Sequence, residues 1–365
     1  MHVRQRGRSS SQSLRHPTRT HGYLRKICHA ELKEALQFEA SKGWCSMLDR
    51  LVGAGRGGIA ESGSGHVSML RGGRVVTAAQ ARGTSLSVAI AAALSLFGAG
   101  CIKHPVMPTE VAKRQLEGAT SGVVAIATAL DENPEHVTLC SGALVAPNLV
   151  LTARHCVSRA VTATPSCDAR GRSHNGAHLA EDADPQMIAV YTGDHVRPET
   201  DTPSAKALVT IHPSGQVLCD ADVAFLVLDR PVYNAAIIPM RLHASVESGD
   251  VVMPVGFGGG RDQVVGKRVA RPFGTVLTTG PASNADTGAV LGPREFEVDN
   301  ATCRGDSGGP ALDARSGEIV GIVSRGGSCT GKGNHVYTRM DAYSKLARSA
   351  MAQAERSMQE TAQRK

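Results

Sequence analysis

The sequence lacks several features that would each point to a different class of protein. No cysteines form a Cys-x-x-Cys pair, and no histidines and cysteines cluster at ligand spacing, so we expect neither a metal site nor a metal cofactor. The uncharged apolar stretch at residues 84–100 is shorter than the about 20 residues that a membrane-spanning helix needs. Internal repeats are also missing. At 365 residues, the chain has room for one large all-β domain or two ordinary ones, plus extensions.

The net positive charge of the chain is confined to its N-terminal end. The 365 residues carry a formal net charge of +7, which by itself would suggest a nucleic-acid or anionic-surface binder. Residues 1–100 account for +9 of that charge, which leaves −2 for residues 101–365. The basic character therefore belongs to the N-terminal region, and we expect no nucleic-acid partner.

Residues 69–100 have the organisation of a secretory signal. Arginines come first, an apolar run follows, and small residues precede Cys101. Ala99-Gly100-Cys101 resembles the end of a bacterial lipobox, although Gly98 stands where Leu is usual. We therefore expect a lipid anchor at Cys101 in a bacterial membrane, as an outer-membrane or cell-surface lipoprotein, ahead of plain secretion.

Residues 1–68 precede that signal and are difficult to place. Met69 would start a signal of ordinary length, so we interpret residues 1–68 as an over-called translation start or a leader that is removed. The alternative is a disordered cytoplasmic arm, since much of the segment is rich in Arg, Ser and Gly. Residues 101–114 contain two prolines and no periodic pattern, and we interpret them as a linker or propeptide.

Short apolar or alternating runs recur between turn residues from there on, which is typical of an all-β barrel or sandwich. Helical spacing with an aspartate at its start predicts one C-terminal helix at residues 341–358. The predicted strands are residues 123–128, 137–144, 149–152, 187–191, 207–211, 223–228, 251–257, 274–278, 318–324 and 335–339.

Residues 303–312 (CRGDSGGPAL) contain the candidate nucleophile, Ser307. A serine between glycines on a tight turn exposes its hydroxyl, and the amides of Gly305 and Ser307 could then bind a developing oxyanion. A serine hydroxyl is reactive only beside a base that is itself oriented by an acid. His155 follows an apolar run in TARHC (152–156), and Asp222 opens a buried strand in CDADVAFLVL (219–228).

These three segments, in the order His155, Asp222, Ser307, resemble the chymotrypsin/trypsin family of serine proteases, over roughly residues 115–348. The resemblance implies two six-stranded antiparallel β-barrels with the site in the cleft between them. Residues 349–365 lie beyond it and are interpreted as the C-terminal helix end and tail. It implies a serine endopeptidase that acts on proteins or peptides through an acyl-enzyme. We expect a monomer without a cofactor.

Near these residues, three side chains receive more specific predictions. Arg154 stands where the family has Ala, so it must point away from the cleft or pair with an acid, because its charge would otherwise depress the basicity of His155. His212 is interpreted as structural. Asp220, the nearest competitor of Asp222, is expected to be solvated.

Of the nine cysteines, Cys28 and Cys45 lie in the leader and Cys101 is the lipid candidate, which leaves six, an even number that suits an oxidising compartment. The family resemblance pairs Cys140 with Cys156 and Cys303 with Cys329. Cys167 and Cys219 are then left for each other, and that bridge would tie the insert after His155 to the loop that delivers Asp222.

In the family, the position of Asp306 receives the α-amino group that is created when a zymogen is cut. Lys113-Arg114 lies at about the right distance before Cys140 for such a cut, although Gln115, Leu116 and Glu117 depart from the usual sequence. Cutting there would also release the chain from an anchor at Cys101.

The family's specificity pocket can be assigned from the same resemblance. Its floor would be Ala301 and Thr302, and its walls Ser324-Arg325-Gly326 and His335. A carboxylate that would bind Arg or Lys is missing from these positions. We therefore predict a small or medium uncharged residue before the cut, and the alternative is an acidic residue bound by Thr302 and His335.

Two other classes of function stay open at this point. One is a catalytically inactive member of the fold that binds partners at the cell surface, and the other is a basic adhesin that uses residues 1–68. The first is disfavoured because all three catalytic residues are present, and the second requires the leader to persist.

Overall fold

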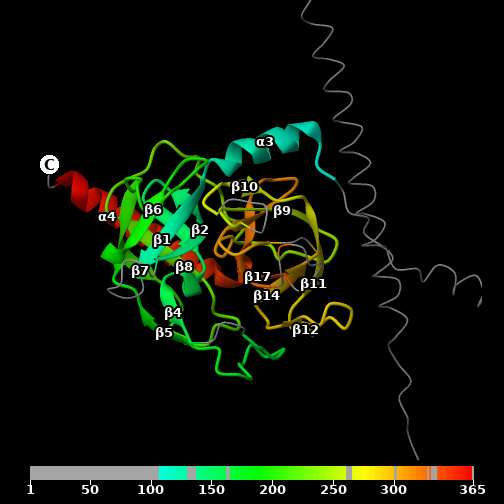
Figure 1. The fold of residues 1–365 in the computed structure, drawn as a ribbon. Helices are drawn as coiled ribbons and strands as arrows, with labels where there is room; N and C mark the ends of the chain where they lie inside the picture. The colour runs from blue at the N-terminus through cyan, green and yellow to red at the C-terminus, as the bar shows by residue number, and fades with distance from the viewer. Residues whose placement is uncertain are drawn as a thin grey trace, which may run out of the picture. The chain divides into compact units, whose positions relative to one another are not determined.

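The computed structural model describes residues 107–129, 137–161, 165–259, 265–299, 302–326, 329 and 335–363. The predicted leader, the signal and Cys101 lie outside these residues. Figure 1 shows two neighbouring groups of strands with a helix at each end of the described chain, α3 (Glu110–Thr120) and α4 (Ser344–Gln363).

The first six-stranded barrel is closed in the order β1-β2-β3-β8-β7-β6, with every pairing antiparallel. Its strands are rich in Val, Ile, Leu and Ala, and most of their residues are buried. The strands are β1 (Val123–Ala129), β2 (Val137–Ala146), β3 (Leu149–Thr152), β6 (Ile188–Tyr191), β7 (Ala205–Ile211) and β8 (Ala224–Leu228).

The second barrel is formed by β9, β11, β14, β17, β16 and β15, and a pairing between β9 and β15 closes it. The short β10 (Val269–Ala270) pairs with β9 at the side. The two closed antiparallel barrels confirm the predicted fold class. The strands are β9 (Val251–Gly256), β11 (Gly274–Thr279), β14 (Glu295–Val298), β15 (Pro310–Asp313), β16 (Ile319–Arg325) and β17 (His335–Arg339).

Two short hairpins extend from the barrels. β4 (Ser158–Ala160) pairs with β5 (Leu179–Asp182) in the insert after His155, and β12 (Ala282–Ser283) pairs with β13 (Val290–Leu291). The single-turn helix η3 (Pro185–Met187) leads into β6.

The C-terminal helix is longer than predicted. A single turn, η4 (Asp341–Tyr343), leads into α4 (Ser344–Gln363). Ala347, Ala350 and Ala354 of α4 are buried and belong to the main hydrophobic core, which contains residues of both barrels. The small side chains allow the helix to lie close to β8 and β3, the elements that it contacts most.

Helix α3 (Glu110–Thr120) corrects the predicted linker, which ended at residue 114. Thr109 caps its N-terminus, accepting a hydrogen bond from the amide of Ala112. Ala112 and Leu116 are buried, and Leu116 belongs to the main hydrophobic core. The sequence contained the capping threonine, but two apolar contacts in eleven residues were too few to predict a helix.

None of the helices in the described part of the chain is long and apolar enough to cross a membrane. All three predicted disulfides, Cys140–Cys156, Cys167–Cys219 and Cys303–Cys329, are formed. Cys167 and Cys219 lie in a small separate hydrophobic cluster with Ala177, Leu179 and Leu218, which is the core of the insert.

Removing the Cys167–Cys219 bridge is expected to destabilise the protein by about 4 kcal/mol, the loop-entropy estimate for a long closed loop. The two cysteines are 52 residues apart, against 16 for Cys140 and Cys156. Urea unfolding of Cys167→Ser/Cys219→Ser against the parent, both without reductant, measures the loss. An unchanged midpoint would contradict a structural role for the bridge.

Candidate active site

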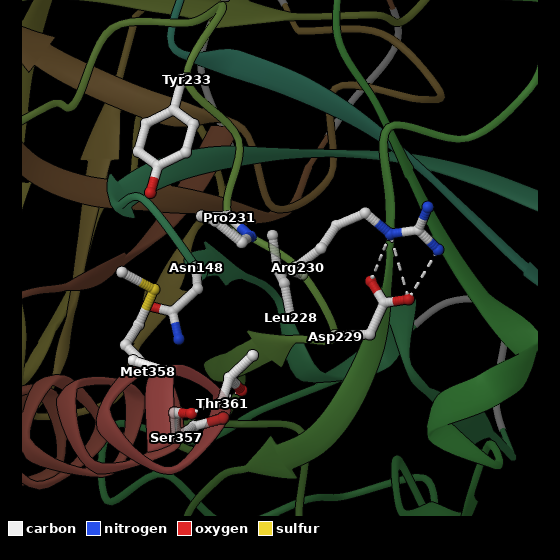
Figure 2. A pocket seen from close by; sticks show the side chains of 10 residues that line it. Asn148, Leu228, Asp229, Arg230, Pro231, Tyr233, Ser357, Met358 and Thr361 are labelled. Atoms are coloured by element: carbon white, nitrogen blue, oxygen red, sulfur yellow. Dashed lines mark hydrogen bonds and ion pairs between the residues drawn. The ribbon is translucent and has the colours of Figure 1, made fainter. Parts of the chain in front are cut away.

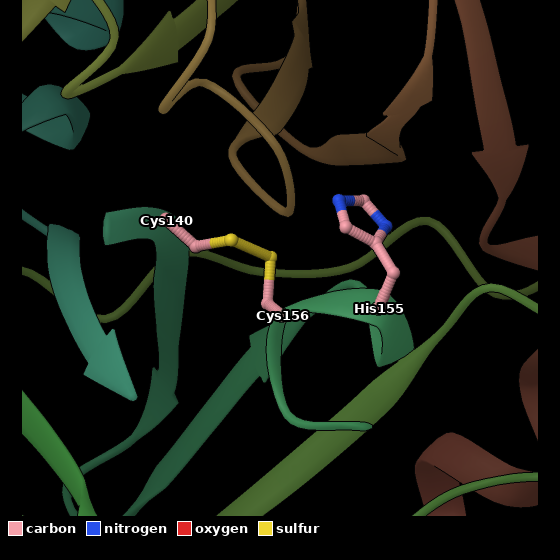
Figure 3. A group of neighbouring side chains, drawn as sticks. All are labelled: Cys140, His155 and Cys156. Atoms are coloured by element: carbon pink, nitrogen blue, oxygen red, sulfur yellow. A yellow bond between two sulfur atoms is a disulfide. The ribbon is translucent and has the colours of Figure 1, made fainter. Parts of the chain in front are cut away.

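His155 lies in η2 (Arg154–Cys156), directly after β3. Figure 3 shows its ring beside the disulfide that joins Cys156 to Cys140 of β2. The disulfide and the strand pairing fix the backbone that carries the imidazole. The side chain of His155 is 17% exposed, so solvent can reach one edge of the ring.

The same three residues bring their ligand atoms within 4.8 Å of one another. Both sulfurs belong to the disulfide, however, and a metal needs a thiolate. The Nδ1 atom of His155 already contacts a carboxylate, as described next. The chemistry of this group therefore does not fit a metal site.

Asp222 lies just before β8 and is completely buried. Its Oδ2 is 2.8 Å from Nδ1 of His155, and its Oδ1 accepts a 2.9 Å hydrogen bond from the His155 backbone amide. Ser324 of β16 donates a further bond of 2.6 Å to Oδ2. Because a carboxylate only accepts, Nδ1 carries the proton, and Nε2 is left as the acceptor.

The two groups change each other's proton affinity. Burial lowers the pKa of His155, but the charge and hydrogen bond of Asp222 raise it, and the net pKa lies above the ordinary value. Burial raises the pKa of Asp222, whereas His155 and Ser324 lower it, and the net pKa lies below the ordinary value. The pair thus stabilises an imidazolium while the carboxylate stays ionised.

The turn that carries Ser307 is bound to the first barrel. Ser141 of β2 donates its amide to the carbonyl of Ser307 (2.8 Å) and its hydroxyl to that of Gly305 (2.7 Å). Gly308, at φ +76°, lies so close to Thr152 and the Ser141 carbonyl that a Cβ there would clash. These contacts place the partly exposed Ser307 beside the segment that precedes His155.

Within this turn, two backbone amides have hydrogen-bond partners among the described residues and two do not. The amide of Asp306 donates to Cys303 (3.0 Å) and that of Gly308 to Val323 (2.8 Å). The amides of Gly305 and Ser307 have no hydrogen-bond partner among the described residues. Gly305 has φ +98°, a conformation that favours glycine. Two unpaired amides on one turn can bind a developing negative oxygen.

Asp306 is buried and is bound by Arg271, which follows β10. Nε of Arg271 is 2.9 Å from Oδ2, and Nη2 is 3.0 Å from Oδ1. The predicted acceptor of a new N-terminus therefore has a cation from within the chain. The sequence contains no motif around Arg271 that would have identified this pairing.

The predicted pocket residues are described only in part, because Ala301 lies outside the described residues. Thr302, Ser324 and His335 are buried, and Gly326 is exposed. Nδ1 of His335 lies 3.3 Å from the amide of Thr302, which donates to it, and 3.2 Å from the Thr302 hydroxyl. Ser324 also contacts Asp222, a role that the prediction of a pocket wall did not include.

The guanidinium of Arg325 is paired within the protein. Its Nη2 donates to Oε2 of Glu295 (2.8 Å) and to the carbonyl of Val290 (3.1 Å), and Nη1 pairs with the other oxygen of Glu295. Glu295 has no solvent exposure. The charge of Arg325 is therefore neutralised by an internal partner.

Arg154 behaves as predicted for a residue that must not disturb His155. It is buried, and it donates to the carbonyls of Pro213 (3.0 Å) and Gly215. Its Nη2 lies 3.7 Å from Asp182, which also accepts hydrogen bonds from Ser158.

His212 is structural, as predicted. Its Nε2 is 2.8 Å from a carboxylate oxygen of Asp182, and its Nδ1 is 2.8 Å from the carbonyl of Pro213. Burial raises the pKa of Asp182, but Ser158, His212 and Arg154 lower it, and the net pKa is lowered.

The prediction that Asp220 is solvated is wrong. Its backbone has φ +66°, and its carboxylate accepts a hydrogen bond from the amide of Arg294. The Tyr343 hydroxyl donates to its carbonyl. Burial is the largest influence on the carboxyl and raises its pKa to about 6. Asp220 thus ties the loop before Asp222 to the second barrel.

A cavity of about 210 Å³ lies elsewhere, along helix α4 (Figure 2). It is lined by residues of α4, of the segment around β8 and of the turn before β3, and none of the three candidate catalytic residues contributes to it. The residues are Asn148, Leu228, Asp229, Arg230, Pro231, Tyr233, Ser357, Met358, Thr361 and Ala362.

Comparison with known proteins gives the following matches. A family model described as trypsin matches residues 120–347. A protein named trypsin from Saccharopolyspora erythraea is 29% identical over 224 residues, which are 58% of this chain and 86% of that protein. A solved structure of a scabies mite inactivated protease paralogue is 18% identical with a TM-score of 0.48, over 65% of this chain and 96% of that one.

Asp222→Asn is expected to lower the pKa of His155, because burial would then act on the imidazolium without the opposing negative charge. NMR titration of the full chain with labelled histidine measures this pKa directly. Asp229→Asn, which removes a partly exposed carboxylate that pairs with Arg230 and with the backbone amide of Lys206, is the control and should leave it unchanged. A His155 pKa that stays the same or rises in Asp222→Asn would contradict the coupling.

Proposed function

The chain belongs to the trypsin family, and on that premise we propose that it is a serine endopeptidase with His155, Asp222 and Ser307 as its catalytic residues. Nε2 of His155 takes the Ser307 proton as the hydroxyl oxygen attacks the peptide carbonyl, and then gives that proton to the leaving amine. The resulting acyl-enzyme is hydrolysed when His155 activates a water in the same way.

The observation that carries this proposal is the hydrogen-bonded pair of His155 and the completely buried Asp222. The pair supports the tautomer that accepts a proton at Nε2, and it favours the imidazolium that forms during attack. The amides of Gly305 and Ser307 support an oxyanion site, in which one donor typically contributes about 3 kcal/mol to the transition state.

For the location, we propose export through the signal at residues 69–100 and a lipid anchor at Cys101. The even set of disulfide-bonded cysteines in the catalytic part supports an oxidising compartment. Substrates would then be proteins or peptides outside the cytoplasm.

For the specificity, we propose a small or medium uncharged residue before the cut. The amide of Thr302 donates to Nδ1 of His335 (3.3 Å), so this nitrogen already has a partner within the protein. Arg325 is paired with Glu295. These contacts favour an uncharged substrate side chain, because neither group presents an unpaired positive charge to an acidic one.

A fluorophosphonate probe is expected to label Ser307 of the protein taken from its natural source. Ser307→Ala should abolish labelling, and His155→Ala should slow it by about 10⁴-fold or more. Ser316→Ala, a change at an exposed serine, is the matched control. Mass spectrometry of the labelled protein should find its N-terminus at Cys101 or later, and therefore no tryptophan, since Trp44 would be gone.

An unlabelled Ser307 in the correctly folded protein would instead favour the catalytically inactive binding protein. Retention of residues 1–68 in the labelled protein would contradict the proposed processing without affecting the proposed catalysis.

A panel of peptides that differ in the residue before the cut tests the specificity. Ala, Val or Leu should give kcat/KM values about 100-fold or more above Glu, Asp and Arg, because an unpaired buried charge costs about 3–5 kcal/mol. Measurement at pH 6 and pH 8 detects any dependence on histidine charge. A preference for Glu or Asp would favour the acidic alternative, and a preference for Arg would contradict both.

A further inference from the structure

Arg271 and Asp306 form a buried ion pair directly beside the turn of Ser307. The side chains are 5% and 2% exposed. The guanidinium contacts both carboxylate oxygens, with Nε 2.9 Å from Oδ2 and Nη2 3.0 Å from Oδ1, and Nη2 also donates to the carbonyl of Gly258 (2.8 Å). This two-point contact fixes the plane of the carboxylate as well as its charge.

The hydrogen-bonding capacity of Asp306 is filled by these contacts and two backbone amides. Oδ1 also accepts from Gly258 (2.9 Å), and Oδ2 from Cys303 (2.7 Å). Two donors on each oxygen match the four acceptor positions of a carboxylate. A Cβ on Gly256 or Gly258 would clash with Asp306, so the neighbouring backbone leaves no space for another group.

Asp306 stands between Gly305 and Ser307, the two residues whose amides form the candidate oxyanion site. Fixing the Asp306 side chain therefore fixes the peptide planes on both sides of it. In a protease that is activated by cutting, a new α-ammonium group would have to supply that cation. Here the chain supplies it from Arg271, without any cut.

The candidate cleavage site at Lys113-Arg114 lies inside α3 and not in an extended loop. Ala112 and Leu116, on either side of it, are buried. A protease acting there would first have to unwind the helix and remove Leu116 from the core, so the structure favours an intact segment.

We propose that Arg271 is the positioning residue that holds the oxyanion turn in its working conformation, so that the enzyme is active without cleavage after Arg114. This proposal rests on the proposed function. An α-ammonium group titrates near pH 8 and an arginine above pH 12. Activity should therefore persist in alkaline solution, where a turn held by an α-ammonium group would lose its cation.

Tyr337 of β17 is a titratable side chain that the charges of Asp306 and Arg271 reach, and Asp299 after β14 acts on it as well. Tyr337 is buried, and its burial and the charge of Asp306 raise its pKa above the ordinary value. It stays neutral across the alkaline range of the experiment and does not replace Arg271 as the source of charge.

The experiment compares the purified full chain with Arg271→Lys, and Arg268→Lys is the matched control. Arg268 is three residues away and pairs with the exposed Asp194. The parent and Arg268→Lys should keep a level kcat up to about pH 11, whereas Arg271→Lys should lose kcat within that range, because a lysine ammonium titrates in alkaline solution and a guanidinium does not, with KM little changed. Arg271→Met should lower kcat/KM by about 100-fold or more at every pH.

Lys113→Gln/Arg114→Gln removes the candidate cleavage site and should leave fluorophosphonate labelling of Ser307 unchanged. Labelling that appears only after a cut following Arg114 would overturn the proposal and leave the proposed function intact. An Arg271→Lys profile identical to that of the parent would overturn it as well, provided that circular dichroism shows both proteins folded over the pH range.

If Ser307 is labelled in neither the cut nor the uncut chain, the proposed function fails, and urea unfolding then tests the ion pair by itself. Arg271→Met, Asp306→Asn and the double variant are compared with the parent. The pairing predicts a double variant with a urea midpoint no lower than that of the more damaging single change. Additive losses would show that the two charges do not depend on each other.

Discussion

A carboxylate without solvent exposure, Asp222, receives hydrogen bonds from both barrels. His155 comes from the first barrel and Ser324 from the second, and Thr338 of the second barrel donates to the Asp222 carbonyl (3.0 Å). Removing a partner from a buried charge typically costs about 3–5 kcal/mol. The alignment of the two barrels and the ionisation of Asp222 therefore depend on each other, and the orientation of His155 follows from both.

Ser141 has a comparable role at the turn of Ser307. Its hydroxyl donates to Gly305 of the Ser307 turn and accepts from the amide of Phe257, which follows β9 (2.8 Å). One side chain of the first barrel thus contacts two segments of the second. The candidate nucleophile is positioned by the strand that also carries Cys140, whose disulfide leads to the residue next to His155.

The sequence predicted most of the apolar strands because their burial is encoded in residues of one kind. All ten predicted strands are present, and their ends shift by no more than two residues. β14 was missed because two of its four residues, Glu295 and Glu297, are charged and yet completely buried. Their partners, Arg325 and Asn284, are distant in the sequence, so no local pattern could have indicated that these carboxylates are paired.

Three residues of the candidate site could likewise be assigned from the sequence, because they lie in segments of distinctive composition. His155, Asp222 and Ser307 lie in short motifs whose composition reflects their chemistry. Ala301 and Cys101 fall outside the described residues, so the roles predicted for them stay predictions. Arg271 was missed because its sequence neighbours carry no signal. An isolated arginine in a sequence is normally a solvated residue, and only the folded chain brings its guanidinium to Asp306.

Three ion pairs of the second barrel join residues that are far apart in the sequence, and each meets the same electrostatic requirement. Asp306 with Arg271, Glu295 with Arg325, and Asp313 with Arg241 each place a carboxylate with little or no exposure against a guanidinium. The fold requires only that a cation reach each carboxylate, and it does not specify where in the sequence that cation lies. A chain end that is created by cutting and an internal arginine are alternative solutions to the same electrostatic requirement at Asp306, and the arginine solution needs no protease and retains its charge at high pH.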